Sequence, residues 1–300
     1  MSTPREAPIL QLGLSAYDLS MANFLALARA ADAAGVDSLW LGEHVFHPRE
    51  YTSVHPGSAK KQHHSGPVVQ ERTHLLDPLT ALSAAAVVTE RIRLATGILV
   101  LPLRDPLLVS RALATLDEIS GGRIVLGVGA GWLEEEFQAL GIEFGDRGRR
   151  LREAVTVIRS CLGGGFVEHH GKVFDFDALQ VVEEPVHVPL IMGGNSDVAL
   201  KRAASVGDGW FSSGSLSQDE AVALRRRVLD LLDERGRDET SFEMVVRPDR
   251  SDADGVVSCV EAGYRHVVVW ADQVWSASDP AEVQVERLRD ALGTMRERAR

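Results

Sequence analysis

The stretch Ile92–Val128 reads IRLATGILVLPLRDPLLVSRALATLDEISGGRIVLGV and holds a complete strand–helix–strand unit. Its two ends, Ile92–Val100 and Ile124–Val128, are short and rich in apolar and β-branched residues, as buried strands are. The segment between them contains a run with helical periodicity, Pro106–Ser120. A strand, a helix and a second strand in this order predict a parallel β/α architecture.

The same alternation continues toward both ends of the chain. Further strands are predicted at Ile9–Leu14, Ser38–Gly42, Pro189–Met192, Gly209–Phe211, Phe242–Val246 and His266–Trp270. Further helices are predicted at Met21–Ala34, from Asp77-Pro78 onward, and at Arg149–Leu162, Asp197–Val206, Asp219–Arg235, Ala253–Ala262 and Pro280–Arg298. Because eight such units close a barrel, we predict that residues 1–300 form one domain with the (β/α)8 TIM-barrel fold.

Three segments are longer than connections in such a barrel need to be. Glu43–Leu76 and Gly129–Gly148 follow the second and fourth strands, so they lie on the C-terminal face, where TIM barrels carry their active sites. Gly163–Val188 lies before the fifth strand and contains a possible hairpin around Val173–Phe176. The alternative architecture is a doubly wound sheet that binds a dinucleotide. It is disfavoured because the glycines of Gly127–Trp132 are spaced G-x-G-x-G and follow the fourth strand, not the first.

The composition is that of an ordinary globular protein, with 45% hydrophobic and 25% charged residues, which excludes disorder and a disulfide scaffold. The 32 basic and 43 acidic residues give a net charge of −11, which disfavours nucleic acid and membrane surfaces as partners. Cys161 and Cys259 form no C-x-x-C motif, and the polar residues 1–8 do not resemble a signal peptide. These features predict a cytoplasmic protein.

Glu43 and His44 are the first candidate catalytic residues, because they directly follow the second strand. A side chain at the C-terminal end of a barrel strand faces the ligand, and imidazole titrates near neutral pH. His44 is the better acid or base, and Glu43 either braces it or binds the backbone. The alternative is that His44 is a solvated loop residue.

Six of the ten histidines lie between His44 and His74, at positions 44, 47, 55, 63, 64 and 74. Their spacings fit no standard set of metal ligands, so no metal site is predicted. The segment Val45–Leu76 also contains several glycines and prolines, which indicate a loop. It is either a lid over the substrate or an ordinary surface loop.

Three glycine-containing segments are candidates for binding a cofactor. Gly97 follows Thr96 inside a strand, where a glycine marks a bulge or the close approach of a ligand. Gly129, Ala130 and Gly131 allow a flat ring or a phosphate near the backbone, and Trp132 offers an apolar wall.

The third segment is Gly193-Gly194-Asn195-Ser196, before a helix, where exposed amides bind anions. The alternative is that Asn195 or Ser196 is a plain helix cap. The glutamates at positions 134, 135 and 136 suit the first turn of a short helix, so no functional role is assigned to them.

Taken in order, these segments resemble the luciferase-like monooxygenase superfamily, and within it the branch that uses the deazaflavin coenzyme F420. The matching stretches are LWLGEH (39–44), RIRLATGILVLP (91–102), RALATLDEISGGR (111–123), LGVGAGW (126–132), EEFQALG (135–141), PLIMGGN (189–195) and GDGW (207–210). The chain departs from the deazaflavin branch at Glu43, where that branch commonly has aspartate before its histidine. In having glutamate at this position, the chain resembles bacterial luciferase.

The resemblance implies an oxidoreductase whose barrel binds a flavin or deazaflavin on its C-terminal face. It implies that His44 is the active-site histidine, and that Thr96, Gly97 and Ile98 lie along the ring system, with a non-prolyl cis peptide near Gly97. Further implied contacts are Gly129, Ala130, Gly131 and Trp132 at the ring and ribityl chain, and Gly193, Gly194 and Asn195 at the phosphate. The resemblance also implies a homodimer.

Three functions are open from the sequence. The first is hydride transfer between coenzyme F420 and a small organic substrate. The second is a two-component monooxygenase that takes reduced FMN from a partner reductase, and the third is a non-catalytic flavin-binding protein. The arginine-rich composition favours the first, and Arg104 and Arg147 are candidates for binding the anionic tail of the deazaflavin. Substrate specificity is assigned to the long loop and to side chains such as Trp210 and Trp270.

Overall fold

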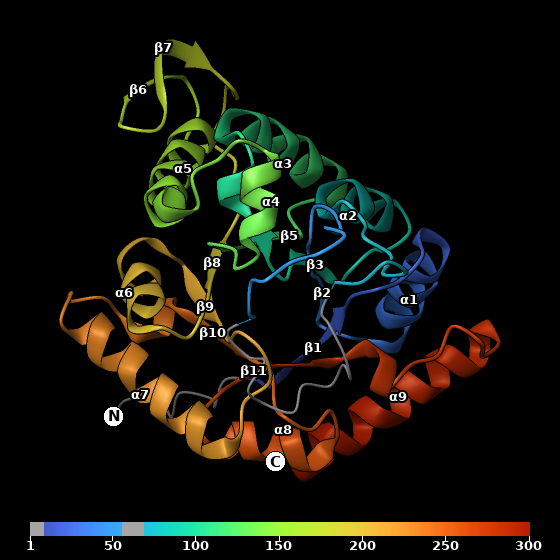
Figure 1. Cartoon of the computed structure of the whole chain (residues 1–300). Coiled ribbons are helices and arrows are strands. Elements are labelled where there is room, and N and C mark those ends of the chain that lie inside the picture. The colour runs from blue at the N-terminus through green and yellow to red at the C-terminus, as the bar shows by residue number, and fades with distance from the viewer. Residues whose placement is uncertain (1–8, 56–68) are drawn as a thin grey trace.

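The computed structural model describes residues 9–55 and 69–300 and shows a closed parallel barrel surrounded by helices (Figure 1). The barrel strands are β1 (Gln11–Ala16), β2 (Ser38–Leu41), β3 (Arg93–Thr96), β4 (Leu99–Val100), β5 (Ile124–Gly129), β8 (Leu190–Gly193), β9 (Gly209–Phe211), β10 (Glu243–Val246) and β11 (His266–Trp270). The surrounding helices are α1 (Met21–Ala34), α2 (Pro78–Val87), α3 (Pro106–Ser120), α5 (Arg147–Leu162), α6 (Asp197–Val206), α7 (Gln218–Asp233), α8 (Ala253–Glu261) and α9 (Ala281–Arg298). The predicted TIM barrel is confirmed.

The sheet closes because β3 pairs with β5 as well as with β2. Around the barrel the strand order is β3, β2, β1, β11, β10, β9, β8 and β5, and every pairing is parallel. Seven strands each contribute one side chain to a buried cluster inside the barrel: Trp40, Ala95, Val125, Ile191, Phe211, Val245 and Val268. The opposite faces of the strands pack on the helices in a larger apolar cluster, so the strands are buried on both sides.

The strand expected at Ile92–Val100 is interrupted in the structure. It divides into β3 and β4 at Gly97 and Ile98, and the peptide bond between these two residues is cis. The glycine is required here because a Cβ at position 97 would lie 2.9 Å from the Cβ of Trp40. The bulge expected at Gly97 and the cis peptide are therefore both found, while the continuous strand is not.

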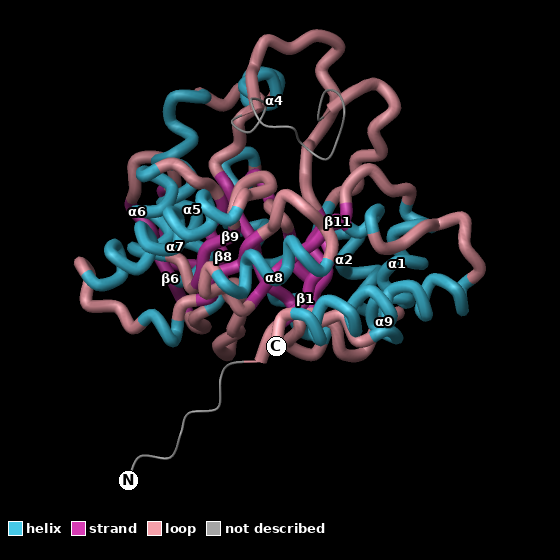
Figure 2. The backbone as a smooth tube through the Cα atoms, turned by 90° about the horizontal axis from the view of Figure 1, so that it is seen from below, coloured by secondary structure: helices cyan, strands magenta, loops and turns pink. Residues whose placement is uncertain are grey.

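Two of the three long connections contain structure of their own. The segment after β5 forms the short helix α4 (Glu134–Ala139), which stands over the carboxyl ends of the strands together with neighbouring loops (Figure 2). The segment before β8 forms an antiparallel hairpin of β6 (Phe166–His170) and β7 (Asp175–Gln180), which projects beyond α3 and α5 in Figure 1. The hairpin expected around residues 173–176 is thus confirmed. In residues 9–55 and 69–300, no helix is both long and apolar enough to cross a bilayer.

Asp32 joins the end of α1 to the entrance of β3. Its carboxylate accepts hydrogen bonds from the backbone N–H groups of Glu90 (3.1 Å), Arg91 (2.9 Å) and Ile92 (2.8 Å). Burial opposes ionisation of Asp32, but the bonds from Ile92, Arg91 and Glu90 outweigh it and hold its pKa below the ordinary value.

We expect Asp32→Ala to lower the free energy of unfolding at pH 7 by about 2–4 kcal/mol, because it leaves backbone donors without an acceptor. Since the folded-state pKa is depressed, this stability is present above the unfolded value of about 3.9 and is lost as pH falls through the folded value. Urea unfolding at pH 7 and at about pH 2, where both states are largely protonated, measures both effects, with Asp32→Asn as the matched variant. An equal loss at the two pH values would contradict the role of the charge.

Candidate active site

A cavity of about 770 Å³ opens at the carboxyl ends of the strands, the end at which TIM barrels bind their ligands. Its volume lies in the range of small-molecule and cofactor sites. Most of the residues selected from the sequence line it: Glu43, His44, Gly97, Ile98, Gly129, Ala130, Gly131, Trp132, Gly193, Gly194 and Asn195. The barrel thus brings together segments that are up to 152 residues apart in the sequence, as the numbers 43 and 195 show.

Thr96 is the exception in this set. Its side chain is buried and its hydroxyl donates to the carbonyl oxygen of Gly127 at 2.6 Å. The side chain of Thr96 lies in the wall between β3 and β5, and its place along a cofactor ring stays a prediction. The bulge turns Gly97 and Ile98, but not Thr96, toward the cavity.

His44 is paired with a carboxylate that the sequence analysis set aside. Nδ1 of His44 lies 3.3 Å from both carboxylate oxygens of Glu136, and both side chains are buried. Glu136 also accepts a hydrogen bond of 2.6 Å from the backbone N–H of Val45, so the carboxylate is fixed in position. Glu136 is therefore more than a residue suited to a helix start. The sequence analysis treated the three glutamates at positions 134–136 together as a helix start, but Glu136 points inward and pairs with His44.

Glu43 does not brace His44. Its carboxylate accepts a 2.5 Å hydrogen bond from the backbone N–H of Val100 and pairs with the guanidinium of Arg104. Arg104 also contacts Asp77 at 2.7 Å, and although burial opposes its charge, the two carboxylates raise its pKa. Of the two roles expected for Glu43, binding the backbone is the one observed. Glu43 fixes β4 at the bulge and still lines the cavity.

Aromatic side chains surround His44. The ring of Trp132 lies edge-on to His44 and His55, with centroid distances of 5.4 and 5.1 Å. Tyr17 approaches His44 from the other side at 6.4 Å. Burial, reinforced by the nearby carboxylates of Asp18 and Glu136, raises the pKa of Tyr17, so its phenol is neutral at physiological pH.

The two tryptophans expected to contact substrate differ in position. Trp270 lines the cavity, as expected. Trp210 is completely buried, and its indole N–H donates to the carbonyl oxygen of Gly194 at 2.7 Å. Successive residues of a strand face opposite sides, and Trp210 takes the helix side while Phe211 takes the interior. Trp210 therefore supports the Gly194 turn and does not face substrate.

Glycines leave room on the side of the cavity formed by β5 and β8. A Cβ at Gly129 would lie 2.6 Å from Cδ1 of Ile98, and a Cβ at Gly193 would lie 3.1 Å from Cγ2 of the same residue. Gly194 has a φ of 114°, a value that side-chain-bearing residues rarely adopt. We call Gly129, Gly131, Gly193 and Gly194 the glycine cradle.

The turn at Gly193 and Gly194 leads directly into α6. Ser196 is the N-cap of that helix, because its hydroxyl accepts from the N–H of Ala199 at 3.3 Å. Asn195 instead bonds the backbone of Ser213 in both directions, at 2.8 Å each. A capping residue is therefore present, and the turn also lines the cavity, while the binding of an anion by its amides stays a prediction.

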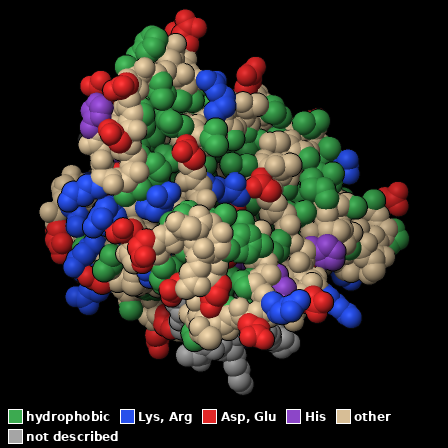
Figure 3. Space-filling view, turned by 45° about the horizontal axis from the view of Figure 1, so that its top comes forward, with side chains coloured by type: hydrophobic (Ala, Val, Ile, Leu, Met, Phe, Trp, Pro, Cys, Tyr) green, Lys and Arg blue, Asp and Glu red, His purple; other side chains and the backbone are tan. Residues whose placement is uncertain are grey.

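Arginines cluster beside this turn. Arg147 and Arg202 line the cavity. Arg202 is buried, and its Nε has no hydrogen-bond partner among the described residues. Burial, together with the charges of Arg152 and Arg147, lowers the pKa of Arg202. Basic side chains also gather at the left of Figure 3, on the side where α6 lies in Figure 1. Of the two arginines expected at the mouth, Arg147 is there, and Arg104 is held by Glu43 and Asp77.

A third arginine that lines the cavity, Arg247, was not selected from the sequence. It follows β10 and is buried, and burial lowers its pKa to about 10. Its guanidinium donates to the hydroxyl of Ser15 at 2.8 Å. The sequence analysis did not consider Arg247, although it directly follows the strand predicted at Phe242–Val246.

The loop after β2 is partly described. Glu135 of α4 accepts hydrogen bonds from the backbone N–H groups of Thr52 (2.7 Å) and Ser53 (3.3 Å), so the first part of the loop is tied to α4 above the cavity. His63 and His64 lie outside the described residues, and the lid role of Val45–Leu76 stays a prediction. Among residues 9–55 and 69–300, no three His, Cys, Asp or Glu side chains are grouped as metal ligands.

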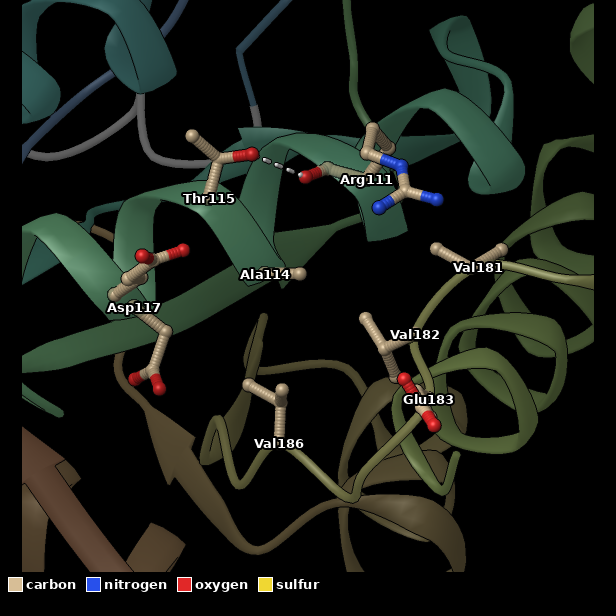
Figure 4. A pocket seen from close by; sticks show the side chains of 9 residues that line it. Arg111, Ala114, Thr115, Asp117, Val181, Val182, Glu183 and Val186 are labelled. Carbon is tan, nitrogen blue, oxygen red and sulfur yellow. Dashed lines mark hydrogen bonds between the residues drawn. The ribbon is translucent and has the colours of Figure 1, made fainter. Parts of the chain in front are cut away.

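A smaller pocket of about 330 Å³ lies on the outside of the barrel (Figure 4). It is formed by side chains of α3, including Arg111 and Thr115, and by residues 181–186 before β8. The hydroxyl of Thr115 bonds the carbonyl oxygen of Arg111 in its own helix, at 3.1 Å. The larger cavity is the candidate active site, because it is lined by a histidine paired with a carboxylate and by two buried arginines.

The comparisons with known proteins identify the family of this chain. Residues 7–249 match the sequence model of the luciferase-like monooxygenases. An uncharacterized protein of Mycobacterium tuberculosis (strain H37Rv) is 31% identical over 248 residues, which are 82% of this chain and 84% of that protein. The F420-dependent glucose-6-phosphate dehydrogenase of Beutenbergia cavernae is 29% identical over 97% of this chain and 83% of that enzyme.

A solved structure shows the same fold. It is an F420-dependent secondary alcohol dehydrogenase in complex with an F420–acetone adduct, with a TM-score of 0.75 and 18% identity. The superposition covers 96% of this chain and 99% of that one. The match to the family model extends to residue 249, beyond the last motif of the resemblance at residues 207–210. The chain therefore belongs to the luciferase-like monooxygenase family and is an enzyme of its oxidoreductase and monooxygenase kind.

Proposed function

We propose that this enzyme transfers a hydride between coenzyme F420 and a small organic substrate, with His44 as the acid or base. The observation that carries the proposal is the combination, in one cavity, of the His44–Glu136 pair, the glycine cradle and Arg202, whose Nε has no hydrogen-bond partner among the described residues. The relative from Beutenbergia cavernae, which is named as F420-dependent and aligns with nearly the whole chain, supports the choice of cofactor.

The residues of the cradle fit the phosphate of a flavin or deazaflavin. Backbone amides before a helix and an arginine without a carboxylate partner are groups that bind a phosphate. Gly193, Gly194 and Arg202 would hold it, while Gly97, Ile98, Ala130 and Trp132 would lie along the ring. Arg147, at the mouth, would meet the anionic tail that coenzyme F420 has and FMN lacks. When bound, the deazaflavin supplies the hydride donor or acceptor.

The protein contributes proton transfer and positioning. Because Nδ1 of His44 faces Glu136, Nε2 is the nitrogen left to exchange a proton with a substrate oxygen. The carboxylate of Glu136 stabilises the imidazolium formed when His44 accepts that proton. Trp132 and Tyr17, packed around the imidazole, limit the access of water to it.

Fluorescence titration with coenzyme F420 and with FMN tests the cofactor. We expect coenzyme F420 to bind more tightly by about tenfold or more, and its affinity to fall more steeply with salt, because arginines hold its charged tail. Arg147→Met is the matched variant and is expected to flatten the salt dependence for coenzyme F420 and to leave FMN binding nearly unchanged. Tighter binding of FMN, or binding of coenzyme F420 that ignores salt, would favour the two-component monooxygenase.

A further inference from the structure

Arg247 is a buried cation with unused hydrogen-bonding capacity inside the active-site cavity. Its Nη2 donates to Ser15, but its Nε has no hydrogen-bond partner among the described residues. In residues 9–55 and 69–300, no carboxylate forms an ion pair with it. A buried charge without a counter-ion is costly, so natural proteins keep one where a ligand completes it.

The side chains around Arg247 hold its guanidinium in one orientation. The guanidinium carbon lies 4.2 Å from the ring centre of Trp270 and 5.0 Å from that of Phe211. Its backbone N–H is bound by the hydroxyl of Ser212 at 3.0 Å. Stacked aromatic rings and the Ser15 hydroxyl restrict the side chain before any ligand arrives. A planar, pre-oriented guanidinium is suited to a carboxylate or phosphoryl group, which it binds through two parallel hydrogen bonds.

The strand order separates this arginine from the glycine cradle. In the closed series β3, β2, β1, β11, β10, β9, β8, β5, each strand faces the strand four places away. Arg247 at the end of β10 therefore faces the Gly97–Ile98 bulge of β3. Trp270 at the end of β11 faces Gly129 of β5, and Ser15 of β1 faces Gly193 of β8. The three residues of the Arg247 side thus stand across the cavity from the three segments assigned to the cofactor.

We propose that Arg247, with Ser15 and Trp270, binds an anionic group of the substrate, either a carboxylate or a phosphoryl group. This inference rests on the proposed function, because that function places the cofactor on the opposite wall and leaves this wall to the substrate. The flanking aromatic rings favour an apolar or planar portion next to the anion. The substrate class is then a small organic anion.

Isothermal calorimetry with benzoate, phenyl phosphate and the neutral analogue benzamide tests the proposal, with and without saturating coenzyme F420. We expect at least one of the anions to bind more tightly than benzamide, and to bind equally well with the cofactor present. Arg247→Met is expected to weaken binding of that anion by about 10–100-fold, the loss of a charge-assisted bidentate contact. Arg247→Lys keeps the charge and is expected to recover part of this affinity.

The matched control is Arg202→Met, which removes the other buried arginine of the cavity. Arg202→Met is expected to weaken cofactor binding and to leave the anion affinity at Arg247 within about twofold of the wild-type value. Arg247→Met is expected to weaken anion binding and to leave the cofactor affinity within about twofold. If Arg247→Met weakens the cofactor instead, or if benzamide binds as well as both anions, the assignment is overturned. Failure of both coenzyme F420 and FMN to bind would reject the proposed function alone, because anion binding is measured without them.

Discussion

His44→Ala is expected to lower kcat by about 10²–10⁴, the usual contribution of a positioned proton-transfer group. The imidazole is fixed by the Glu136 carboxylate at 3.3 Å and by the ring of Trp132 at 5.4 Å. Alanine removes the proton carrier and leaves the cradle untouched, so the Kd of the cofactor is expected to change by less than about threefold. Stopped-flow kinetics with the substrate that the wild-type enzyme turns over fastest measure kcat, and titration measures Kd.

Added imidazole separates proton transfer from a purely structural role of His44. The cavity left by His44→Ala has the shape of the missing ring, and free imidazole is expected to recover part of the lost rate. His170 is the matched control, because it also pairs with a carboxylate, Asp175 at 2.7 Å, but on the exposed hairpin. His170→Ala is expected to leave kcat unchanged. A His44→Ala enzyme with full turnover, or one that imidazole does not restore at all, would remove His44 from the proton-transfer step.

The fold was predictable because it depends on local patterns that repeat. Strand β5 and helix α3 are found within one residue of their expected bounds, since apolar runs and helical periodicity are properties of neighbouring residues. The bulge at Gly97 was visible as a glycine within a β-branched run. What the pattern did not show is that the chain divides there into two strands, because this depends on Glu43 binding the N–H of Val100 from 57 residues away.

The candidate site was predictable only where residues act through their position at a strand end. His44 and the glycines of the cradle follow strands directly, so their place at the mouth follows from the barrel alone. The partners of His44 and Glu43 depend on side-chain directions across the cavity. Glu136 is 92 residues from His44, and nothing in three consecutive glutamates indicates which one turns inward. Arg247 directly follows β10 and could have been selected by the same argument from position.

The turn at Gly194 is where the second large effect is expected. Its φ of 114° lies in the region that a β-branched residue avoids, and a Cβ there would lie 2.9 Å from the Cβ of Ala199. Forcing valine into this conformation costs about 1–3 kcal/mol. The backbone is expected to relieve that strain by displacing the turn from the wall of the cavity, which also breaks the hydrogen bond of 3.4 Å from the N–H of Gly194 to the carbonyl oxygen of Phe211.

Gly194→Val is accordingly expected to weaken cofactor binding by about 10–100-fold, since each 1.4 kcal/mol is a factor of about ten in Kd. The loss is expected for coenzyme F420 and FMN alike, because the proposed function assigns the turn to the phosphate that both carry, and kcat at saturating cofactor is expected to change little. Gly121→Val is the matched control: its φ of 66° is also positive, with no atom within 4 Å of the added Cβ, but it ends α3 at the opposite end of the barrel. That variant is expected to lose stability and keep its cofactor affinity. If both variants bind the cofactor as the wild-type protein does, the segment is a capped helix start, and Arg202 alone would have to account for the phosphate.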